Sequence, residues 1–211
     1  MTPIIEFKNY TFKYRSQSEP TLRDIDLRVN PGGKGLIVGP SGSGKSTLVH
    51  CINGMVPFSY PGESSGTLTV GGKDPAKTGI FGMSKIVGTV LQDTDGQFIG
   101  LTVAEDVAFA LENDCVEQEE MFRAVDEVAE VVDIKALLGN APTELSGGQK
   151  QRVSMAGVLV DDVDILLFDE PLANLDPATG TRAIDLIDRI CRERHKTVIN
   201  IEHRLEDALY R

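Results

Sequence analysis

The chain has few basic residues for its length. Its 211 residues include 21 lysines and arginines against 32 aspartates and glutamates, which gives a formal net charge of −11. Tight nonspecific binding to nucleic acid depends on lysine and arginine side chains that neutralise phosphates, so this balance argues against nucleic acid as a partner. A local basic patch is still compatible with it. Any anionic ligand must then be held by a local site that works against the overall field.

Long apolar runs are also missing. No stretch approaches the roughly 20 apolar residues that a helix needs to cross a bilayer. The first residues, Met1 to Glu6, contain no basic region followed by an apolar run, so no signal peptide is expected. If the protein works at a membrane, a partner must therefore supply the membrane span.

Cysteine is scarce. Cys51, Cys115 and Cys191 are odd in number and widely spaced, which predicts small buried hydrophobic side chains in a reducing compartment. With 41% apolar and 25% charged residues, the remaining composition is that of an ordinary soluble domain. A chain of this length can bury roughly 70% of its unfolded surface in one domain.

Strand-like and helix-like patterns alternate along the chain. Residues 4–14 and 25–29 have β-rich, partly alternating patterns on either side of a polar loop, which predicts an early antiparallel sheet. Further strands are expected at residues 35–38, 66–70, 85–91, 164–168 and 196–201. Helices are expected at residues 45–53, 102–112, 117–132, 146–160, 176–194 and 204–210.

Three helix starts carry specific signals. Thr102 and Glu105 form a capping box, Ser146 can cap the next helix, and Asp176-Pro177 combines a cap with a proline in the first turn. The order of elements predicts one α/β domain over residues 1–211, with an antiparallel β part at its N-terminus. Residues of about 93–160 are expected to form a helical subdomain within it.

A glycine-rich loop lies between a predicted strand and a predicted helix. Its sequence fits the pattern G-x-x-x-x-G-K-S/T as Gly39-Pro40-Ser41-Gly42-Ser43-Gly44-Lys45-Ser46-Thr47. Glycines let backbone N–H groups converge on phosphate oxygens, and the helix N-terminus adds a favourable dipole. Lys45 is expected to neutralise β/γ-phosphate charge and the Ser46 hydroxyl to bind Mg²⁺. The loop therefore predicts binding of a nucleoside triphosphate.

Two carboxylates follow a short apolar strand further along the chain. Asp169 ends the run Asp164-Ile165-Leu166-Leu167-Phe168 and Glu170 comes directly after it. A carboxylate at a strand end can hold a Mg²⁺-bound water, and its neighbour can orient or deprotonate an attacking water. Such a pair is by itself often only a solvated turn. Its position after a phosphate loop favours the catalytic interpretation.

A third motif, Leu145-Ser146-Gly147-Gly148-Gln149-Lys150-Gln151-Arg152, lies between these two. With all three motifs in this order, the chain resembles the ATP-binding cassette (ABC) ATPases from about residue 4 to residue 203. The resemblance implies a P-loop nucleoside triphosphatase fold with ATP and Mg²⁺ as cofactors. It also implies ATP hydrolysis with Glu170 as the catalytic base.

Further roles follow from the same resemblance, residue by residue. Gln92 resembles the Q-loop glutamine that contacts Mg²⁺ or the water, and His203 matches the switch histidine that contacts the γ-phosphate. Tyr14 matches the aromatic residue that stacks on adenine, although core packing is a rival interpretation because Tyr10 and Phe12 are close in sequence. His50 and His195 are expected to be structural or solvated.

The resemblance also implies a second ATPase domain. Ser146, Gly147, Gly148 and Gln149 open a helix and so form a second anion site, which in the family faces the γ-phosphate of the opposite subunit. Asp176 matches the D-loop carboxylate at that interface. A single copy should therefore bind ATP through Lys45 but hydrolyse it poorly.

Softer features indicate the type of ABC protein. The run Gln92-Asp93-x-Asp95-x-Gln97-Phe98 is similar to the ATPases of energy-coupling factor importers for vitamins and metals, and residues 138–144 and 201–206 are importer-like. This predicts peripheral attachment, through a transmembrane subunit, to the cytoplasmic face of the cell membrane. The transported substrate cannot be inferred from this sequence, because in this family another subunit recognises it.

Two other function classes stay open at this point. One is a soluble ABC mechanoenzyme acting on ribosomes or DNA, which the acidic charge disfavours. The other is a nucleotide-gated interaction module without turnover, which the presence of Glu170 and His203 disfavours. Only eight residues follow His203, so the C-terminal part is expected to be truncated, or the chain to be the first half of a tandem two-cassette protein.

Overall fold

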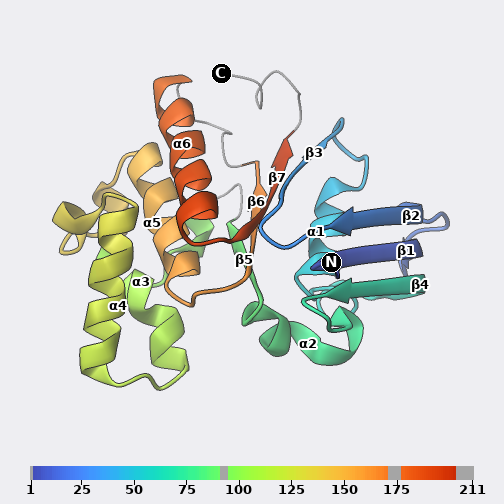
Figure 1. Cartoon of the computed structure of the whole chain (residues 1–211), viewed down its shortest axis with the longest axis horizontal. Coiled ribbons are helices and arrows are strands. Elements are labelled where there is room, and N and C mark those ends of the chain that lie inside the picture. Colours follow the sequence, from blue (N-terminus) through green and yellow to red (C-terminus); the bar gives the residue numbers. More distant parts are fainter. Residues whose placement is uncertain (1, 91–94, 171–176, 203–211) are drawn as a thin grey trace. The chain divides into compact units, whose positions relative to one another are not determined.

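A computed structural model describes residues 2–90, 95–170 and 177–202 of the chain (Figure 1). The described residues divide into two compact units. The first unit takes in residues 1–89, 163–169 and 194–202, and the second takes in residues 90–162 and 170–193. The helical segment expected at residues 93–160 falls within the first stretch of the second unit.

An antiparallel sheet in the first unit consists of β1 (Ile5–Tyr14), β2 (Leu22–Val29) and β4 (Gly62–Val70), in the order β2-β1-β4 (Figure 1). In β1, Ile5 and Phe7 are buried, and then Tyr10 and Phe12. The alternation shifts by one residue because β1 is irregular here: its pairing with β2 shifts between Phe7 and Tyr10, and its pairing with β4 shifts between Lys8 and Thr11. The predicted antiparallel sheet is confirmed, but two strands begin earlier than residues 25 and 66.

A second sheet of the first unit has the order β3-β7-β6-β5. Its strands are β3 (Lys34–Val38), β5 (Val87–Val90), β6 (Ile165–Asp169) and β7 (Thr197–Glu202). Both β3 and β6 run parallel to β7. The first four residues of β6 are at most 1% exposed, as expected of a strand whose two faces are both covered. This continuous apolar run is what made β6 recognisable in the sequence.

Two helices also belong to the first unit, α1 (Lys45–Ile52) and α2 (Pro75–Ser84). The helix α2 was not predicted. Asp74 caps it by accepting a hydrogen bond from the Ala76 backbone N–H, and Pro75 occupies its first turn. At Gly79 the backbone leaves the helical region, with φ 81°, which obscures the helical pattern in the sequence.

The second unit is helical. Its longer helices are α3 (Val103–Asn113), α4 (Gln118–Val131), α5 (Gly147–Leu159) and α6 (Pro177–Glu193). Short 3₁₀ helices occur at η1 (Asp95–Gln97), η2 (Lys135–Leu137) and η3 (Pro142–Glu144). The helix α5 packs against α3, α4 and α6. Within the described ranges, no helix combines the length and the apolar character that a bilayer span requires.

The predicted capping box of α3 is confirmed. The Thr102 hydroxyl accepts a hydrogen bond from the Glu105 N–H at 3.3 Å, and the Glu105 carboxylate accepts one from the Thr102 N–H at 3.0 Å. Such reciprocal bonds satisfy N–H groups that have no partner within the helix. This explains why the start of α3 was placed correctly from sequence.

The cysteines only partly match their prediction. Cys51 and Cys191 are buried, but Cys115 is exposed, and the three form no disulfide with one another. Cys115 lies just beyond the end of α3, where the backbone has φ 55°. The expectation that all three are buried was therefore wrong for Cys115. Burial raises the pKa of the Cys51 thiol to about 12.

We predict that Cys115 is the first cysteine to react with iodoacetamide at pH 7.5. The thiolate is the reactive form, and burial both shields Cys51 and keeps it protonated at that pH. Peptide mass spectrometry after a short exposure should find label on Cys115, and label on Cys51 only after unfolding in guanidinium. Equal early labelling of the two residues would contradict the structure.

Candidate functional site

The glycine-rich loop connects the end of β3 to the start of α1. Gly42 and Gly44 have φ values of 79° and 94°, in the left-handed region that residues with a Cβ rarely adopt. Gly44 is also the N-cap of α1, and no side chain caps the helix there. The N-terminus of α1 therefore presents its backbone N–H groups and its positive dipole end to the loop.

Lys45 adds a full positive charge to this loop. Its ammonium group donates hydrogen bonds to the carbonyl oxygens of Gly39, at 2.7 Å, and of Pro40, at 3.1 Å. The residue is only 8% exposed, so the loop backbone holds its side chain in place. The loop thus combines a helix N-terminus with a lysine folded over it, which is an arrangement suited to a phosphate group.

Asp169 lies at the same edge of the sheet as this loop. In the parallel register with β7, Val38 of β3 pairs with Glu202 and Asp169 of β6 pairs with Ile201. The carboxyl ends of β3 and β6 therefore coincide to within one residue. The Asp169 charge also raises the pKa of His50 on α1, although burial has the larger effect and lowers it.

The Ser46 hydroxyl and the Asp169 carboxylate are hard oxygen donors of the kind that Mg²⁺ binds. No group of three or more His, Cys, Asp or Glu residues that could hold a metal ion by itself occurs among the described residues. Mg²⁺ at nucleotide sites is usually held by one or two protein ligands together with substrate phosphates and waters. The donor set fits that ion.

Glu170 follows Asp169 with an unusual backbone conformation. Its φ is 54° and it is 8% exposed. A residue with a Cβ in the left-handed region costs roughly 1–2 kcal/mol, and residues under such strain concentrate at functional sites. The structure therefore singles out the residue for which the sequence predicts the role of base. That role itself stays a prediction.

Tyr14 lies at the end of β1 and reaches toward α1. Its hydroxyl is 2.8 Å from the Thr47 hydroxyl, and its ring meets Phe12 and Tyr60 edge to face. Tyr10, in contrast, is 7% exposed and donates a hydrogen bond to the Cys51 sulfur. Tyr10 is thus a core residue, whereas Tyr14 lies at the margin of the core. Its contact with adenine stays a prediction.

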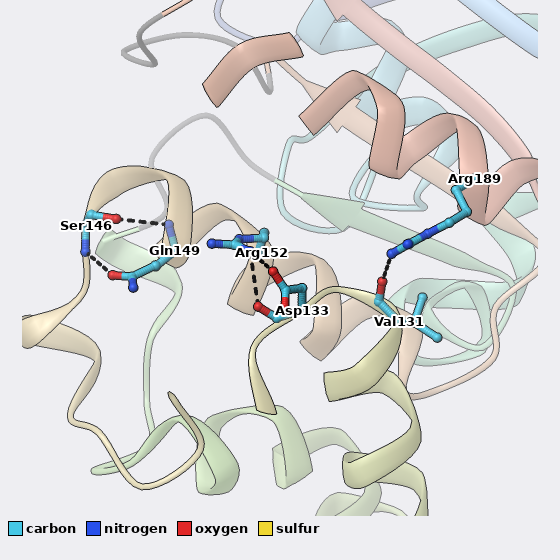
Figure 2. A network of polar contacts seen from close by, with 6 residues as sticks. All are labelled: Val131, Asp133, Ser146, Gln149, Arg152 and Arg189. Atoms are coloured by element: carbon cyan, nitrogen blue, oxygen red, sulfur yellow. Dashed lines mark hydrogen bonds and ion pairs between the residues drawn. The ribbon is translucent and has the colours of Figure 1, made fainter. Parts of the chain in front are cut away.

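The second predicted anion site lies in the second unit, at the start of α5 (Figure 2). The Ser146 hydroxyl accepts a hydrogen bond from the Gln149 N–H at 3.4 Å, and the Gln149 side chain accepts one from the Ser146 N–H at 2.8 Å. This capping box fixes the turn that begins the helix. Gly147 and Gly148 form the first turn, so their backbone can approach a ligand closely.

An arginine-lined cavity of about 680 Å³ adjoins Ser146 and Gly148. Arg152 on its wall donates to the Asp133 carboxylate at 2.9 Å and to the Asp133 carbonyl oxygen at 3.1 Å (Figure 2). Arg189, on α6, donates to the Val131 carbonyl oxygen. These two arginines tie α5 and α6 to the chain at the end of α4 and so support the Ser146 turn.

The loop before α3 is held by two carboxylates of that helix. Asp106 accepts hydrogen bonds from the Ile99 N–H at 2.7 Å and the Gly100 N–H at 3.0 Å. Glu105 accepts one from the Leu101 N–H at 2.9 Å. The loop consequently exposes two large apolar side chains, with Ile99 65% and Leu101 82% exposed.

A smaller cavity of about 160 Å³ lies beside this loop and has Gln97 and Ser154 in its wall. The Gln97 side-chain oxygen and the Ser154 hydroxyl are buried, and within the described part of the chain neither has a hydrogen-bond partner. Buried polar atoms usually have partners. Gln97, noted in the sequence beside Phe98, therefore has a buried side-chain oxygen whose partner does not lie among the described residues.

Three predicted site residues, Gln92, Asp176 and His203, lie outside the described residues, as does the helix expected at residues 204–210. Conversely, sequence reasoning missed Tyr60, and it assigned no function to His50. The rings of these two residues stack on one another, and the Tyr60 ring also meets the Tyr14 ring edge to face. No local sequence pattern marks such a contact, because it depends on the register of β1 with β4.

Comparison with protein families now decides the identity. The family model described as ABC transporter matches residues 22–173, which is most of the chain. The chain belongs to the ABC transporter family. It is an ATPase domain of that family, and the predicted fold and enzyme class are confirmed.

Relatives of this ABC domain are named ABC transporter ATP-binding proteins. A protein from Streptococcus mutans is 60% identical over 211 residues, all of this chain and 38% of the relative. One from Enterococcus faecalis is 63% identical over 207 residues, 98% of this chain and 36% of the relative. The chain thus spans little more than a third of the length of these relatives.

A solved structure shares the fold of the ABC domain. It is CbiO1 from Clostridium perfringens, described as part of the ABC transporter complex CbiONQ. The TM-score is 0.87 at 30% identity, with 97% of this chain and 80% of that chain covered. The mixed architecture of an antiparallel sheet, a parallel sheet and helices is therefore that of a known ABC ATPase.

We predict that Lys45→Ala weakens ATP binding by the full-length protein roughly 10- to 100-fold. Hydrogen bonds to a charged group contribute about 1.5–3 kcal/mol each, and Lys45 is the charge folded over the phosphate loop. Lys135→Ala is the matched control, because the ion-pair partners of Lys135 among the described residues are the acidic side chains of Asp126 and Glu130. Isothermal titration calorimetry should separate the two variants. Equal ATP affinity in both would refute the assignment.

Proposed function

We propose that this ABC domain binds and hydrolyses ATP to power a membrane importer of the energy-coupling factor type, for a vitamin or a metal ion. The observation that carries the proposal is the coincidence of the Lys45 loop with Asp169 at one sheet edge. Family membership and the likeness to CbiO1, a part of the CbiONQ transporter complex, support it. Which substrate is imported depends on another subunit.

In this proposal, residues 39–47 hold the triphosphate of ATP. The N–H groups at the start of α1 and the Lys45 ammonium neutralise phosphate charge. Ser46, Asp169 and Gln92 would hold Mg²⁺, which supplies further neutralisation of the phosphates. Tyr14 stacks on adenine, and because every base has a π-face, this contact requires no base-specific hydrogen bond.

Hydrolysis needs a group that orients or deprotonates the attacking water. We assign this role to Glu170, which directly follows Asp169 and is held in a strained backbone conformation. His203 is assigned to the γ-phosphate. The mechanism is then ATP-driven closure of two ATPase domains, attack by water activated at Glu170, and reopening.

The partner in this closure is a second ABC ATPase domain, in another chain or in the same one. Ser146, Gly147, Gly148 and Gln149 would contact the γ-phosphate held by the partner, and Asp176 would cross the interface. Support comes from the capping box, which rigidly places the helix N-terminus, and from the arginine-lined cavity beside it. Each domain therefore contributes two half-sites.

We predict that Glu170→Gln in the full-length protein preserves ATP binding but lowers steady-state hydrolysis at least about 100-fold. General base catalysis typically contributes 10²- to 10⁴-fold, and glutamine is nearly isosteric with glutamate but is not a base. Hydrolysis is measured by phosphate release, and the closed dimer by size-exclusion chromatography with ATP.

A matched control for this variant is Glu112→Gln, an exposed position near the end of α3. It should leave both binding and hydrolysis unchanged. Undiminished hydrolysis in Glu170→Gln would show that another residue is the base. Loss of ATP binding in Glu170→Gln would show instead that Glu170 belongs to the nucleotide pocket.

The proposal places the domain at the cytoplasmic face of the membrane, held by a transmembrane subunit. The loop before α3 is the feature that supports such docking. It exposes Ile99 and Leu101 while Asp106 and Glu105 hold its backbone. Beside it lies the cavity that has Gln97 and Ser154 in its wall.

We predict that Leu101→Asp reduces co-purification of the full-length protein with its membrane subunit at least about tenfold. Removing an exposed apolar anchor and adding a charge that must be buried on docking both oppose association. Phe122→Asp, also an exposed apolar position of the second unit, serves as control. ATP affinity should not change in either variant. Co-purification with ribosomes rather than membranes would favour a soluble mechanoenzyme.

A further inference from the structure

Four side chains of the first unit form a circuit of contacts that begins and ends on α1. The Tyr14 hydroxyl lies 2.8 Å from the Thr47 hydroxyl. The Tyr14 ring meets the Tyr60 ring edge to face, with centroids 6.4 Å apart at 82°. Tyr60 in turn stacks on His50, at 4.3 Å and 13°. Thr47 and His50 are three residues apart on the helix and therefore share one face.

Backbone hydrogen bonds fix the position of Tyr60. Its N–H and that of Ser59 both donate to the Met55 carbonyl oxygen, at 3.2 and 2.7 Å. The next residues enter β4, where Gly62 pairs with Tyr14 and the Pro61 carbonyl accepts a hydrogen bond from the Arg15 N–H at 3.0 Å. The register of β1 with β4 thus brings Tyr60 alongside Tyr14.

Gly62 is required for this pairing. A Cβ at this position would lie 2.4 Å from the Lys13 carbonyl oxygen and 2.5 Å from the Phe12 ring. The Phe12 ring occupies the space that a side chain would take, and it also packs edge to face on Tyr14, at 4.9 Å. Phe12 and Tyr60 therefore both hold the Tyr14 ring in one orientation.

His50 supplies a flat, uncharged surface for Tyr60. Burial lowers the pKa of His50, and the opposing effect of the Asp169 charge is smaller, which favours the uncharged form of the ring. Its Nδ1 is buried, and among the described residues it has no hydrogen-bond partner. The ring therefore acts through contact area on that side rather than through a polar bond.

We infer that Tyr60 is a positioning residue for nucleobase binding: it orients Tyr14, while the bond from Tyr14 to Thr47 fixes the ring relative to the phosphate loop. The inference rests on the proposed function, in which Tyr14 stacks on adenine. Because the circuit closes on α1, the surface for the base and the helix that binds phosphate form one rigid part. Such preorganisation raises affinity without adding a contact to the ligand.

The test compares a ligand that has a base with one that has none. ATP and inorganic tripolyphosphate are titrated, with Mg²⁺, into the full-length protein with any other phosphate loop disabled. Tyr60→Leu should weaken ATP binding about 3- to 10-fold, the range expected for loss of an aromatic pair, and should leave tripolyphosphate affinity within about twofold. Tyr60→Phe, which retains the ring, should restore ATP affinity.

Two further variants separate this inference from the proposed function. Tyr14→Phe retains the ring but removes the bond to Thr47, and it should weaken ATP binding about 2- to 5-fold. Tyr14→Ala removes the stacking surface and should weaken ATP binding more than any other variant. Neither change should affect tripolyphosphate binding by more than about twofold.

Each contrary result has one meaning. If Tyr14→Ala weakens ATP binding and Tyr60→Leu does not, the role of Tyr60 is wrong and the proposed site stands. If Tyr60→Leu weakens ATP and tripolyphosphate equally, Tyr60 supports α1 in general and the inference fails. Unchanged ATP binding in Tyr14→Ala would overturn the adenine contact, and the inference would fail with it.

Discussion

The parallel register of β3, β7 and β6 is the constraint on which the rest of the first unit depends. Because β3 and β6 both pair with β7, their carboxyl ends reach the same edge of the sheet. The glycine-rich loop follows the end of β3, and β6 ends with the carboxylate of Asp169. Lys45 and Asp169, which are far apart in sequence, are therefore brought to the same edge of the sheet. A one-residue slip of β6 would turn its carboxylate to the other face of the sheet.

The electrostatics of the two predicted anion sites depend on backbone geometry more than on net charge. The chain carries a formal charge of −11, yet both α1 and α5 present helix N-termini to their sites. They differ in how these ends are built. Gly44 leaves the start of α1 without a side-chain cap, whereas Ser146 and Gln149 cap α5 reciprocally.

Sequence reasoning succeeded where a local pattern determines the structure. The capping residues Thr102 and Ser146, the apolar run of β6 and the glycine loop each act within a few residues, and each element was found near its observed place.

The helix α2 was missed although Asp74-Pro75 is the same start signal that was used at Asp176-Pro177. Gly79, where the backbone leaves the helical region, interrupts α2. Cys115 was wrongly expected to be buried, because exposure at the end of a helix is set by packing. Tyr60 could not be found, since its contact with Tyr14 exists only once β1 and β4 are paired, and His50 contacts Tyr60 rather than Tyr14.

The pairing of β3 with β7 also has a consequence for the order in which the protein becomes structured during synthesis. The only described neighbour of β3 in its sheet is β7, a strand that the ribosome makes some 160 residues later. The apolar residues of β3 therefore lack this partner strand until the whole second unit has been synthesised. Within that unit, α3 and α4 contact one another and are close in sequence. Contacts of long sequence separation form slowly and leave strand edges open meanwhile. The glycine-rich loop thus leaves the ribosome long before β7, the strand that pairs with β3 beside it.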